Sequence, residues 1–527
     1  MVVADAATGR SLPVHHYFAA LKARLEDAAR REDAVIPQGT GGGENLPAVD
    51  ARAHAQAYAR APAHAPAHPR EQVAVETIEL DGRCVALCDA DAEYGLDNGF
   101  NLLETSTRPL RQSEGGLAAL AGRVGRGLGH VLDALQADGA CVLNASQHPD
   151  CPRDAAWYER VRVPRPIYRE LVGHRGWRHW EGIDAKAQNG ANTQVPVADA
   201  VRALNVMIGL AAAHVAIFAN SPLESGRETA LKETRLTVWP RVFHGSRFAG
   251  DAMLTAWPPR PFLHLGDYFR WMFRPGTVSR SLPMDRRHDY KSAPTVLLDG
   301  DPSLSAFLAS REWPGKRTDT GEAVVLQPHT AHFEHSQIAQ FMDARLRYRL
   351  GTLPDLDVLM AAWRRPEGLE RLFEDHGAQT YIEGRCPGAG FPDEVLLTEA
   401  GVGVARSMIM SPLALQWGLL QRLDDAERLV ARHRWAELRD LRDRAMRHAL
   451  HDPDVARLCA DVVEVARDGL EAAERRWLDY AGYVTETRRC AADRMLQTWR
   501  ELAGLSPAQR LARVVNRHRA LALCPYS

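Results

Sequence analysis

Residues 380–385 read Thr-Tyr-Ile-Glu-Gly-Arg, and this stretch decides the expected fold because it joins a strand pattern to a row of polar side chains. Alternation with a period of two places Tyr381, Glu383 and Arg385 on one face of a strand and the isoleucine on the other, against the core. Gly384, opposite the polar face, indicates close packing or a distortion of the strand. We therefore predict a rigid strand with one polar face. The alternative is a surface strand with a local Glu–Arg pair of little energetic weight.

Short strand-like segments alternate with helical segments between Gln72 and about Gly401. Besides 380–385, the strand-like segments are Val73–Leu80, Leu102–Thr107, Ala140–Asn144 and Ala323–Gln327. They are short, and the connections between them are uneven. An α+β fold with antiparallel pairing is therefore favoured over a doubly wound parallel sheet.

Changes in composition divide the chain into three regions. Residues 1–70 contain a predicted surface helix over 12–33, followed by a linker rich in Ala, Pro and Gly. Residues 71–410 form the α+β body. Residues 411–527 have a helical pattern almost throughout, and we expect about three helices. The first begins at Ser411-Pro412, and the breaks are at Asp452-Pro453 and Ser506-Pro507.

The composition is that of an ordinary soluble protein and excludes a mostly disordered or collagenous chain. Lys and Arg total 65 and Asp and Glu total 67, so the formal charge is −2, and no nucleic-acid or membrane partner is expected. Eight scattered cysteines and a start without a secretory pattern favour a reducing cytoplasm. The longest apolar window, Val201–Ala219, contains Arg202 and His214, so it predicts a buried helix rather than a membrane span.

Three further segments carry polar side chains at defined positions. In residues 97–109, a strand would hold Glu104 rigidly, with Ser106 on the same face; the alternative is an edge-strand glutamate that faces water. In residues 189–199, Gln194 would lie close to a helix start capped by Asp199.

The third segment, residues 219–240, is a loop with Asn220, Arg227, Arg235 and Trp239. Arginines of this kind bind carboxylate or phosphate groups with two parallel hydrogen bonds. Isolated arginines, however, are usually solvated.

Together, and in this order, these segments resemble the second family of glutamate-cysteine ligases, which includes plant-type and many bacterial enzymes and related carboxylate–amine ligases. The resemblance rests on Glu104 with the Thr and Pro that follow it, the Asn-Thr-Gln segment before a long apolar helix, the Asn-Ser-Pro loop with its later Arg and Trp, and the Tyr-Ile-Glu-x-Arg strand. It covers about residues 72–425, including the Ser-Pro-Leu-Ala-Leu-Gln-Trp-Gly helix from Ser411.

The resemblance implies a glutamine-synthetase-like fold, in which an antiparallel sheet curves around the site and is flanked by helices, here with a helical C-terminal extension. ATP would phosphorylate the γ-carboxyl of glutamate, and the amine of cysteine would attack the acyl phosphate to give γ-glutamylcysteine, as in glutathione biosynthesis. ATP and Mg²⁺, or Mn²⁺ in its place, are the implied cofactors. The implied partners are small molecules, namely glutamate and cysteine or another amine, and a homo-oligomer is compatible with the long C-terminal helices.

The resemblance also implies residue roles. The metal ligands would be Glu76, Glu104 and Glu383; the groups that hold the nucleotide would be Gln194, Arg345, Arg347 and Arg385; the substrate groups would be Asn220, Arg227, Arg235 and Trp239. Arg385 and Glu383 would be the catalytic pair, because Arg385 would stabilise charge on the transferring phosphoryl group.

Two departures from the family pattern put these roles in question. The first strand lacks the Gly-x-Glu-x-Glu pattern and spaces Glu76 and Glu79 by three, which predicts opposite faces for them. Pro196 stands where the family commonly has His or Asn. An inactive ligase fold that serves as an interaction protein therefore stays open as an alternative, as does a ligase for another carboxylate or amine.

A zinc hydrolase is the rival enzyme class. His329, His332 and His335 are metal-ligand residue types, and a helix would bring the last two to one face, but the spacing is not His-Glu-x-x-His.

Overall fold

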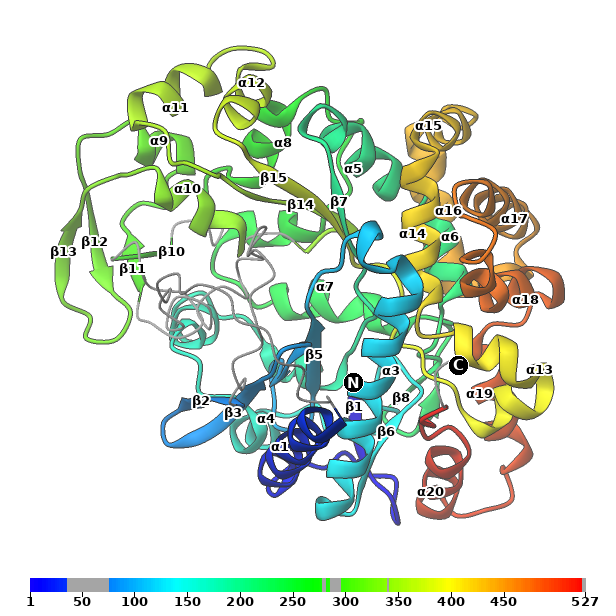
Figure 1. The fold of residues 1–527 in the computed structure, drawn as a ribbon. Coiled ribbons are helices and arrows are strands. Elements are labelled where there is room, and N and C mark those ends of the chain that lie inside the picture. Colours follow the sequence, from blue (N-terminus) through cyan, green and yellow to red (C-terminus); the bar gives the residue numbers. More distant parts are fainter. Residues whose placement is uncertain (36–74, 277–280, 285–294, 339–340, 524–527) are drawn as a thin grey trace.

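The computed structural model describes residues 1–35, 75–276, 281–284, 295–338 and 341–523. The predicted linker after the first helix lies outside these residues. The fold is α+β, as expected, with several antiparallel sheets and a helical C-terminal region (Figure 1).

Every strand pair in the described residues is antiparallel. The sheets run β2 (Glu76–Leu80), β3 (Arg83–Cys88), β4 (Ala92–Leu96), β5 (Leu103–Thr107); β14 (Ala344–Arg349), β15 (Gln379–Gly384), β7 (Asn192–Val195); β10 (Ser281–Pro283), β11 (Thr295–Leu298), β12 (Trp313–Arg317), β13 (Ala323–Leu326); β1 (Val2–Asp5) with β6 (Ala140–Leu143); and β8 (Leu223–Glu224) with β9 (Arg227–Glu228). The five predicted strand segments are thus confirmed, with shifts of up to three residues at their ends.

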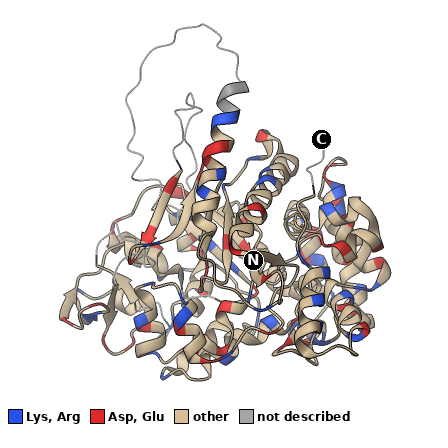
Figure 2. Cartoon of the chain, turned by 90° about the horizontal axis from the view of Figure 1, so that it is seen from below, with Lys and Arg blue, Asp and Glu red and all other residues tan. Residues whose placement is uncertain are grey.

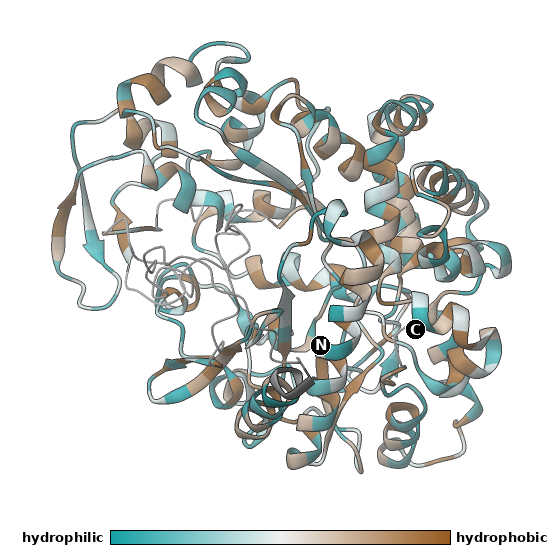
Figure 3. Cartoon of the chain, viewed as in Figure 1, coloured by the Kyte–Doolittle hydropathy of each residue, from teal (hydrophilic) through white to brown (hydrophobic). Residues whose placement is uncertain are grey.

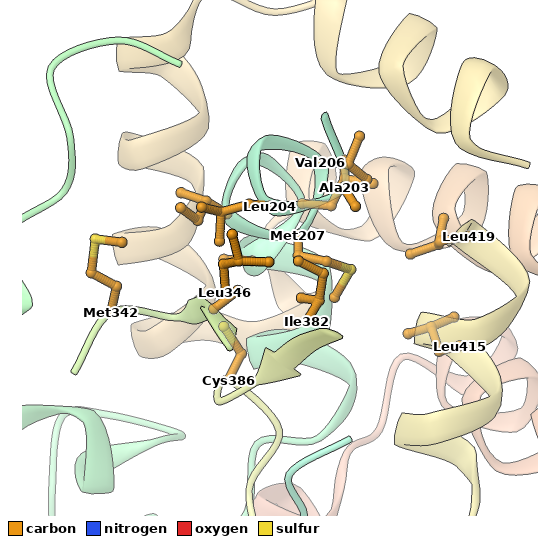
Figure 4. Packing of buried hydrophobic residues seen from close by; sticks show 14 of the residues in the cluster. Ala203, Leu204, Val206, Met207, Met342, Leu346, Ile382, Cys386, Leu415 and Leu419 are labelled. Atoms are coloured by element: carbon orange, nitrogen blue, oxygen red, sulfur yellow. The ribbon is translucent and has the colours of Figure 1, made fainter. Parts of the chain in front are cut away.

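The sheet β14–β15–β7 separates a polar face from an apolar one. Leu346 and Ile382 are fully buried and point toward Leu204 and Met207 of the neighbouring helix α5 (Ala200–Gly209) (Figure 4). The period-two pattern that predicted this division is confirmed, because the apolar face must be removed from water.

Gly384 allows a close approach behind this sheet. A Cβ atom at this position would collide with the Gln416 side chain of helix α14 (Ser411–Gln421). Gln416 donates from Nε2 to the carbonyl oxygens of Ala191 (3.1 Å) and Ile382 (3.0 Å) and to Oγ1 of Thr193 (3.0 Å), which ties the helix to two strands. The close packing predicted from the glycine is confirmed.

A β-bulge lies between the first two strands of the other large sheet. The register of β2 against β3 shifts between Ile78 and Glu79, so Glu76 is opposite Cys88 and Glu79 is opposite Cys84. The extra residue, Val85, lies on β3, so the bulge inserts no residue into β2 and leaves the alternation of that strand intact. Both glutamates are exposed, and their predicted opposite faces stay a prediction.

The first residues of the chain belong to the body. β1 pairs with β6, and α1 (Tyr17–Val35) packs on α3 (Gly116–Leu135). Tyr17 and Leu21 of α1 are buried in the same cluster as Val85 and Leu103 of the sheet β2–β5. The predicted helix is confirmed, although it begins five residues later than expected.

The long apolar window forms two helices rather than one. α5 (Ala200–Gly209) and α6 (Ala211–Ile217) meet at Leu210 with a bend of 50°. Within the described residues, no single helix has the length and apolar composition to cross a membrane, and the bent pair meets the test on those two criteria alone. Asp199 stands at the start of α5, but its carboxylate binds Arg202 (2.8 Å) and makes no cap hydrogen bond, so the predicted cap was wrong.

The C-terminal helices surround α5 and α6. They are α14 (Ser411–Gln421), α15 (Leu423–Ala431), α16 (Trp435–His448), α17 (Pro453–Asp468), α18 (Asp479–Thr487), α19 (Ala491–Glu501) and α20 (Pro507–Arg517). The starts at the three Ser-Pro and Asp-Pro sites are confirmed, and Asp452 and Ser506 cap their helices. The expected number of three was wrong, because non-helical turns after Gln421, Ala431, Asp468 and Thr487 interrupt the pattern.

The remaining helices lie in the body. They are α4 (Ala155–Val161), α7 (Val238–Phe243), α8 (Leu265–Met272), α9 (Leu304–Leu308), α10 (Ala331–His335), α11 (Leu356–Trp363), α12 (Gly368–Asp375) and α13 (Glu394–Ser407). Acidic and basic residues are interspersed over the helices in Figure 2, whereas α14 in the interior carries much of the hydrophobic colour in Figure 3.

Candidate functional site

The polar face of the sheet β14–β15–β7 gathers four of the predicted site residues. Arg345 is opposite Glu383, and Arg347 is opposite Tyr381, which in turn is opposite Gln194. Directly opposed residues in antiparallel strands project from the same face. Segments separated by up to 189 positions in the sequence, from Gln194 to Glu383, therefore place their side chains on one surface.

Glu383 is the centre of an arginine cluster. Its Oε2 accepts from Nε of Arg345 (2.7 Å) and of Arg347 (3.0 Å), and its Oε1 accepts from a terminal nitrogen of Arg385 (2.7 Å). These four side chains are only 10–19% exposed. Three guanidinium groups around one carboxylate give the cluster more positive than negative charge, which suits it to bind a polyanion.

Burial and mutual repulsion within this cluster shift its pKa values. Burial, and then the neighbouring Arg347, lower the pKa of Arg345 to about 10. Burial opposes ionisation of Glu383, but the three arginines outweigh it and hold the pKa of that carboxyl well below its usual range. At neutral pH Arg345 and Glu383 are therefore both charged.

An aromatic wall adjoins the cluster. The Arg385 guanidinium lies 5.9 Å from the ring centre of Phe341, and the rings of Phe341 and Trp239 are 4.1 Å apart. Trp239 belongs to α7 and is partly exposed. On its other side, Nζ of Lys186 lies 4.8 Å from the indole ring centre, within the range of a cation–π contact.

The charge of Lys186 interacts both with carboxylates of the sheet β2–β5 region and with Arg385, which follows β15. Its Nζ lies 3.8 Å from Oδ2 of Asp97, and the side chain is 9% exposed. Burial lowers the pKa of Lys186; Asp97 and Glu104 counteract this effect, whereas Arg385 and Arg235 add to it. Glu104 of β5 is therefore in the electrostatic neighbourhood of a lysine that also senses Arg385.

Lys186 is a functional candidate that our sequence interpretation missed. It lies between Ala185 and Ala187, and all three residues are buried. A lysine is almost never fully buried without a partner. Its apolar neighbours in the sequence were therefore a weak indication that it is buried and paired with another group. Nothing in the local pattern indicates that Trp239, 53 positions away, would cover it.

Arg235 is buried and is bonded to the backbone next to the arginine cluster. It is 5% exposed, and it donates from Nε to Glu233 (2.7 Å) and from a terminal nitrogen to the carbonyl oxygen of Cys386 (2.6 Å). Glu233 is fully buried and also accepts from the hydroxyl groups of Ser146 and Ser221. Arg235 thus holds the backbone that follows Arg385, while its predicted contact with substrate stays a prediction.

Two other predicted substrate residues are not brought next to the cluster by any contact seen in the described residues. Asn220 is buried, and its amide donates to Asn144 (2.9 Å) and to the carbonyl oxygen of Ala389 (2.9 Å). Arg227 is exposed on the β8–β9 hairpin. Asn220 is thus held by protein atoms, and its predicted contact with substrate, like that of Arg227, stays a prediction.

The carboxylates of the sheet β2–β5 share one face. Glu76 is opposite Cys88, which is opposite Glu93, and Glu104 lies on the same side one strand further. Strands are spaced by roughly 4.8 Å, so the backbones at Glu76 and Glu104 are roughly 14 Å apart across three strand steps. Glu93, which we did not single out from the sequence, is the nearer neighbour of Glu104. Among the described residues, no group of three or more His, Cys, Asp or Glu side chains is arranged to hold a metal ion.

The histidines at the start of α10 pack against each other. The rings of His329 and His332 are stacked 3.6 Å apart. His332 is fully buried, its Nδ1 accepts from the backbone of His329 (3.1 Å), and its Nε2 lies 3.2 Å from the carbonyl oxygen of Pro283. Both ring nitrogens of His332 therefore face protein atoms, which disfavours the zinc alternative.

Comparison with known families adds an independent observation. A family model described as glutamate-cysteine ligase family 2 (GCS2) matches residues 91–305. The match covers less than half of the chain. Members of the family are ATP-dependent carboxylate–amine ligases, and they include ligases other than glutamate-cysteine ligases. No curated protein matches the chain.

The family segment supplies only part of the site. It contains Glu104, Lys186 and Trp239, whereas Arg345 and Glu383 come from beyond its end. The positively charged cluster is therefore built by residues outside the segment that the family model matches.

Proposed function

We propose that the protein is an ATP- and Mg²⁺-dependent ligase that joins a carboxylate to an amine, with glutamate and cysteine as the first pair to test. The observation that carries this proposal is the arginine cluster around Glu383, because it is a preformed polyanion site on a rigid sheet. The family of residues 91–305 supports the same reaction class. The family also implies that the sheets form a glutamine-synthetase-like curved surface.

The arginines would hold the phosphates of ATP. Phosphoryl transfer depends mainly on positioning and on stabilising negative charge, and guanidinium groups do both. Arg345 and Arg347 project from one strand and are aligned by the shared carboxylate of Glu383. Arg385, nearest to the aromatic wall, is placed to stabilise the phosphoryl group that is transferred.

Mg²⁺ or Mn²⁺ would be held by carboxylates of the sheet β2–β5. These ions prefer oxygen ligands, and Glu104 is exposed with Glu93 on the adjacent strand of the same face. The ion would neutralise charge on the phosphates. Glu383 fits the ligand role less well, since its two oxygens already accept from three arginines. Glu76 is too distant along the sheet to share the same ion with Glu104 without an intervening ligand.

The reaction needs no nucleophilic side chain. An oxygen of the substrate carboxylate forms a bond to the γ-phosphorus of ATP, and ADP leaves. The amine nitrogen then forms a bond to the acyl carbon, inorganic phosphate leaves, and the amine proton passes to solvent. Lys186, buried between Trp239 and Asp97, is placed to bind the anionic acid substrate next to Arg385.

An assay of ADP release with ATP, Mg²⁺, glutamate and a panel of amines tests the proposal, with cysteine as the first amine. ADP that appears only when both glutamate and an amine are present supports it, and the amine that works identifies the acceptor. A second panel that varies the acid tests the alternative ligase. Absence of ADP release with every acid–amine pair would refute the proposed ligase activity and favour the alternative of an inactive ligase fold that serves as an interaction protein. Lys186→Met should raise KM for the acid, and Lys186→Arg should restore part of the loss.

A further inference from the structure

Helix α16, in the C-terminal region, contacts both segments that converge on Arg385. Its Arg442 donates from Nε and from a terminal nitrogen to the two carboxylate oxygens of Asp343, the latter bond measuring 2.7 Å. One turn later, the carbonyl oxygen of Met446 accepts from the backbone N–H groups of Lys232 (2.8 Å) and Glu233 (3.2 Å). Positions 442 and 446 lie on one face of the helix.

The contact at Asp343 leads directly to the cluster. The carbonyl oxygen of Asp343 accepts from the backbone N–H of Arg385 (2.8 Å) and from the thiol of Cys386 (3.4 Å). Asp343 also immediately precedes β14, which carries Arg345. Moving Asp343 would therefore move two of the guanidinium groups that surround Glu383.

The contact at Met446 leads to the same place by another route. Glu233 accepts from Arg235 (2.7 Å), and Arg235 donates to the carbonyl oxygen of Cys386 (2.6 Å). The connections form a closed circuit from α16 through Asp343 to Arg385 and Cys386, and back through Arg235 and Glu233 to α16.

We propose that Arg442 is a positioning residue, and that α16 completes the ligase site by fixing Arg385 through this circuit. The proposal rests on the proposed function for its kinetic consequence, but not for the mechanical link itself. Arg442 and Asp343 are only 19% and 10% exposed, so the pair is shielded from water and is oriented by two parallel bonds. Simple packing of the C-terminal helices on the core would not require a charged pair aimed at the strand that carries the arginines.

The experiment compares full-length Arg442→Gln and Asp343→Asn, which break the link from opposite sides, with Arg442→Lys, which keeps the charge. Arg439→Gln is the matched control, because Arg439 is on the same helix but 55% exposed, near Asp440. Hydrogen–deuterium exchange is measured for the peptides that cover 343–349 and 380–390. kcat and KM for ATP are measured separately in the same preparations.

The proposal expects faster exchange in both peptides for Arg442→Gln and Asp343→Asn, with no change for Arg439→Gln. It also expects kcat/KM for ATP to fall by roughly tenfold to a hundredfold, since small misplacements of catalytic groups have effects of that size. Arg442→Lys should recover part of this loss, and the double variant should be no worse than the single ones, because both changes break one link.

Unchanged exchange in these peptides would overturn the proposal whether or not the protein is a ligase. Normal kcat/KM in Arg442→Gln, in a wild-type enzyme that is active, would overturn the positioning role. If the wild type releases no ADP with any substrate pair, the proposed function fails, and the exchange measurements still decide whether α16 fixes Arg385.

Discussion

Replacing Glu383 with Gln removes the carboxylate that Arg345, Arg347 and Arg385 share, while it changes the side-chain volume very little. Loss of one partner of a buried ion pair costs about 3–5 kcal/mol, because the remaining charges are left unsatisfied. Since these side chains retain 10–19% exposure, we take the lower end, about 3 kcal/mol.

This free energy translates into a modest shift of the melting temperature. The entropy of unfolding is about 2.1 cal/mol/K per residue, so a chain of this length that unfolds as one unit loses about 3 °C for about 3 kcal/mol. Differential scanning calorimetry at pH 7 measures the shift. Glu159→Gln is a matched control, because Glu159 forms an exposed pair with Arg162 and its loss should leave the melting temperature unchanged.

The acid dependence gives a second measure of the same interaction. The pKa of Glu383 is lowered in the folded state, so its ionised form stabilises the protein at every pH above its unfolded pKa of about 4.3. This contribution is lost as the pH falls from there through the folded pKa. The difference in stability between wild type and Glu383→Gln should therefore be constant above about pH 5 and shrink in more acidic solution.

The kinetics of Glu383→Gln distinguish an arginine organiser from a metal ligand. If Glu383 orients the arginines, kcat should fall while the Mg²⁺ concentration for half-maximal rate stays the same. Wild-type stability and wild-type kcat in Glu383→Gln would refute the role of Glu383 in organising the three arginines. A rate restored by excess Mg²⁺ would show that Glu383 binds the ion.

Three further predictions concern the surroundings of the cluster. Glu104→Gln should raise the Mg²⁺ concentration for half-maximal ADP release roughly tenfold or more without changing the melting temperature; an unchanged Mg²⁺ curve would remove Glu104 from the metal site. Gly384→Ala should destabilise the protein by about 1–3 kcal/mol in urea titrations, because its methyl group meets the Gln416 side chain, and equal midpoints would contradict the close packing. Burial lowers the pKa of His214 to about 4, so protonation of this group alone should lower the free energy of unfolding by about 1.4 kcal/mol for each pH unit as the pH falls from about 6.5 to about 4. The free energy of unfolding should therefore fall less steeply with acidification in His214→Gln. Parallel curves for the two proteins would show that His214 does not contribute to the acid sensitivity.

The sequence was sufficient for the strand that carries Glu383, because period-two alternation depends on local geometry alone. The same local rule accounts for the shared face of Arg345 and Arg347 on β14. It gave no sign of the extra residue that the neighbouring sheet carries at Val85 of β3. It also failed at Leu210, where two helices replace one.

Site residues whose role depends on distant partners could not be assigned from the sequence. The resemblance implied substrate contacts for Asn220 and Arg235, and these stay predictions; the structure shows in addition that both are buried and bonded to protein atoms. Their partners lie 150 or more positions further along the chain, at Ala389 and Cys386. Lys186 was missed for the same reason: its partner Trp239 is remote in sequence. Local patterns give the direction of a side chain, whereas its partners follow from pairings that no local rule determines.

The division of charge between segments explains why the family match alone does not describe this site. Residues 91–305 supply Glu104, whose negative charge suits a divalent cation, and Lys186. The excess of positive charge around Glu383 comes from β14 and β15, which follow that segment. A nucleotide with its cation needs both kinds of charge within one site, so binding should depend on how firmly the later strands are held against the earlier ones. Arg235, which bonds to Cys386 across this division, and α16, which contacts both sides, are the elements that provide that hold.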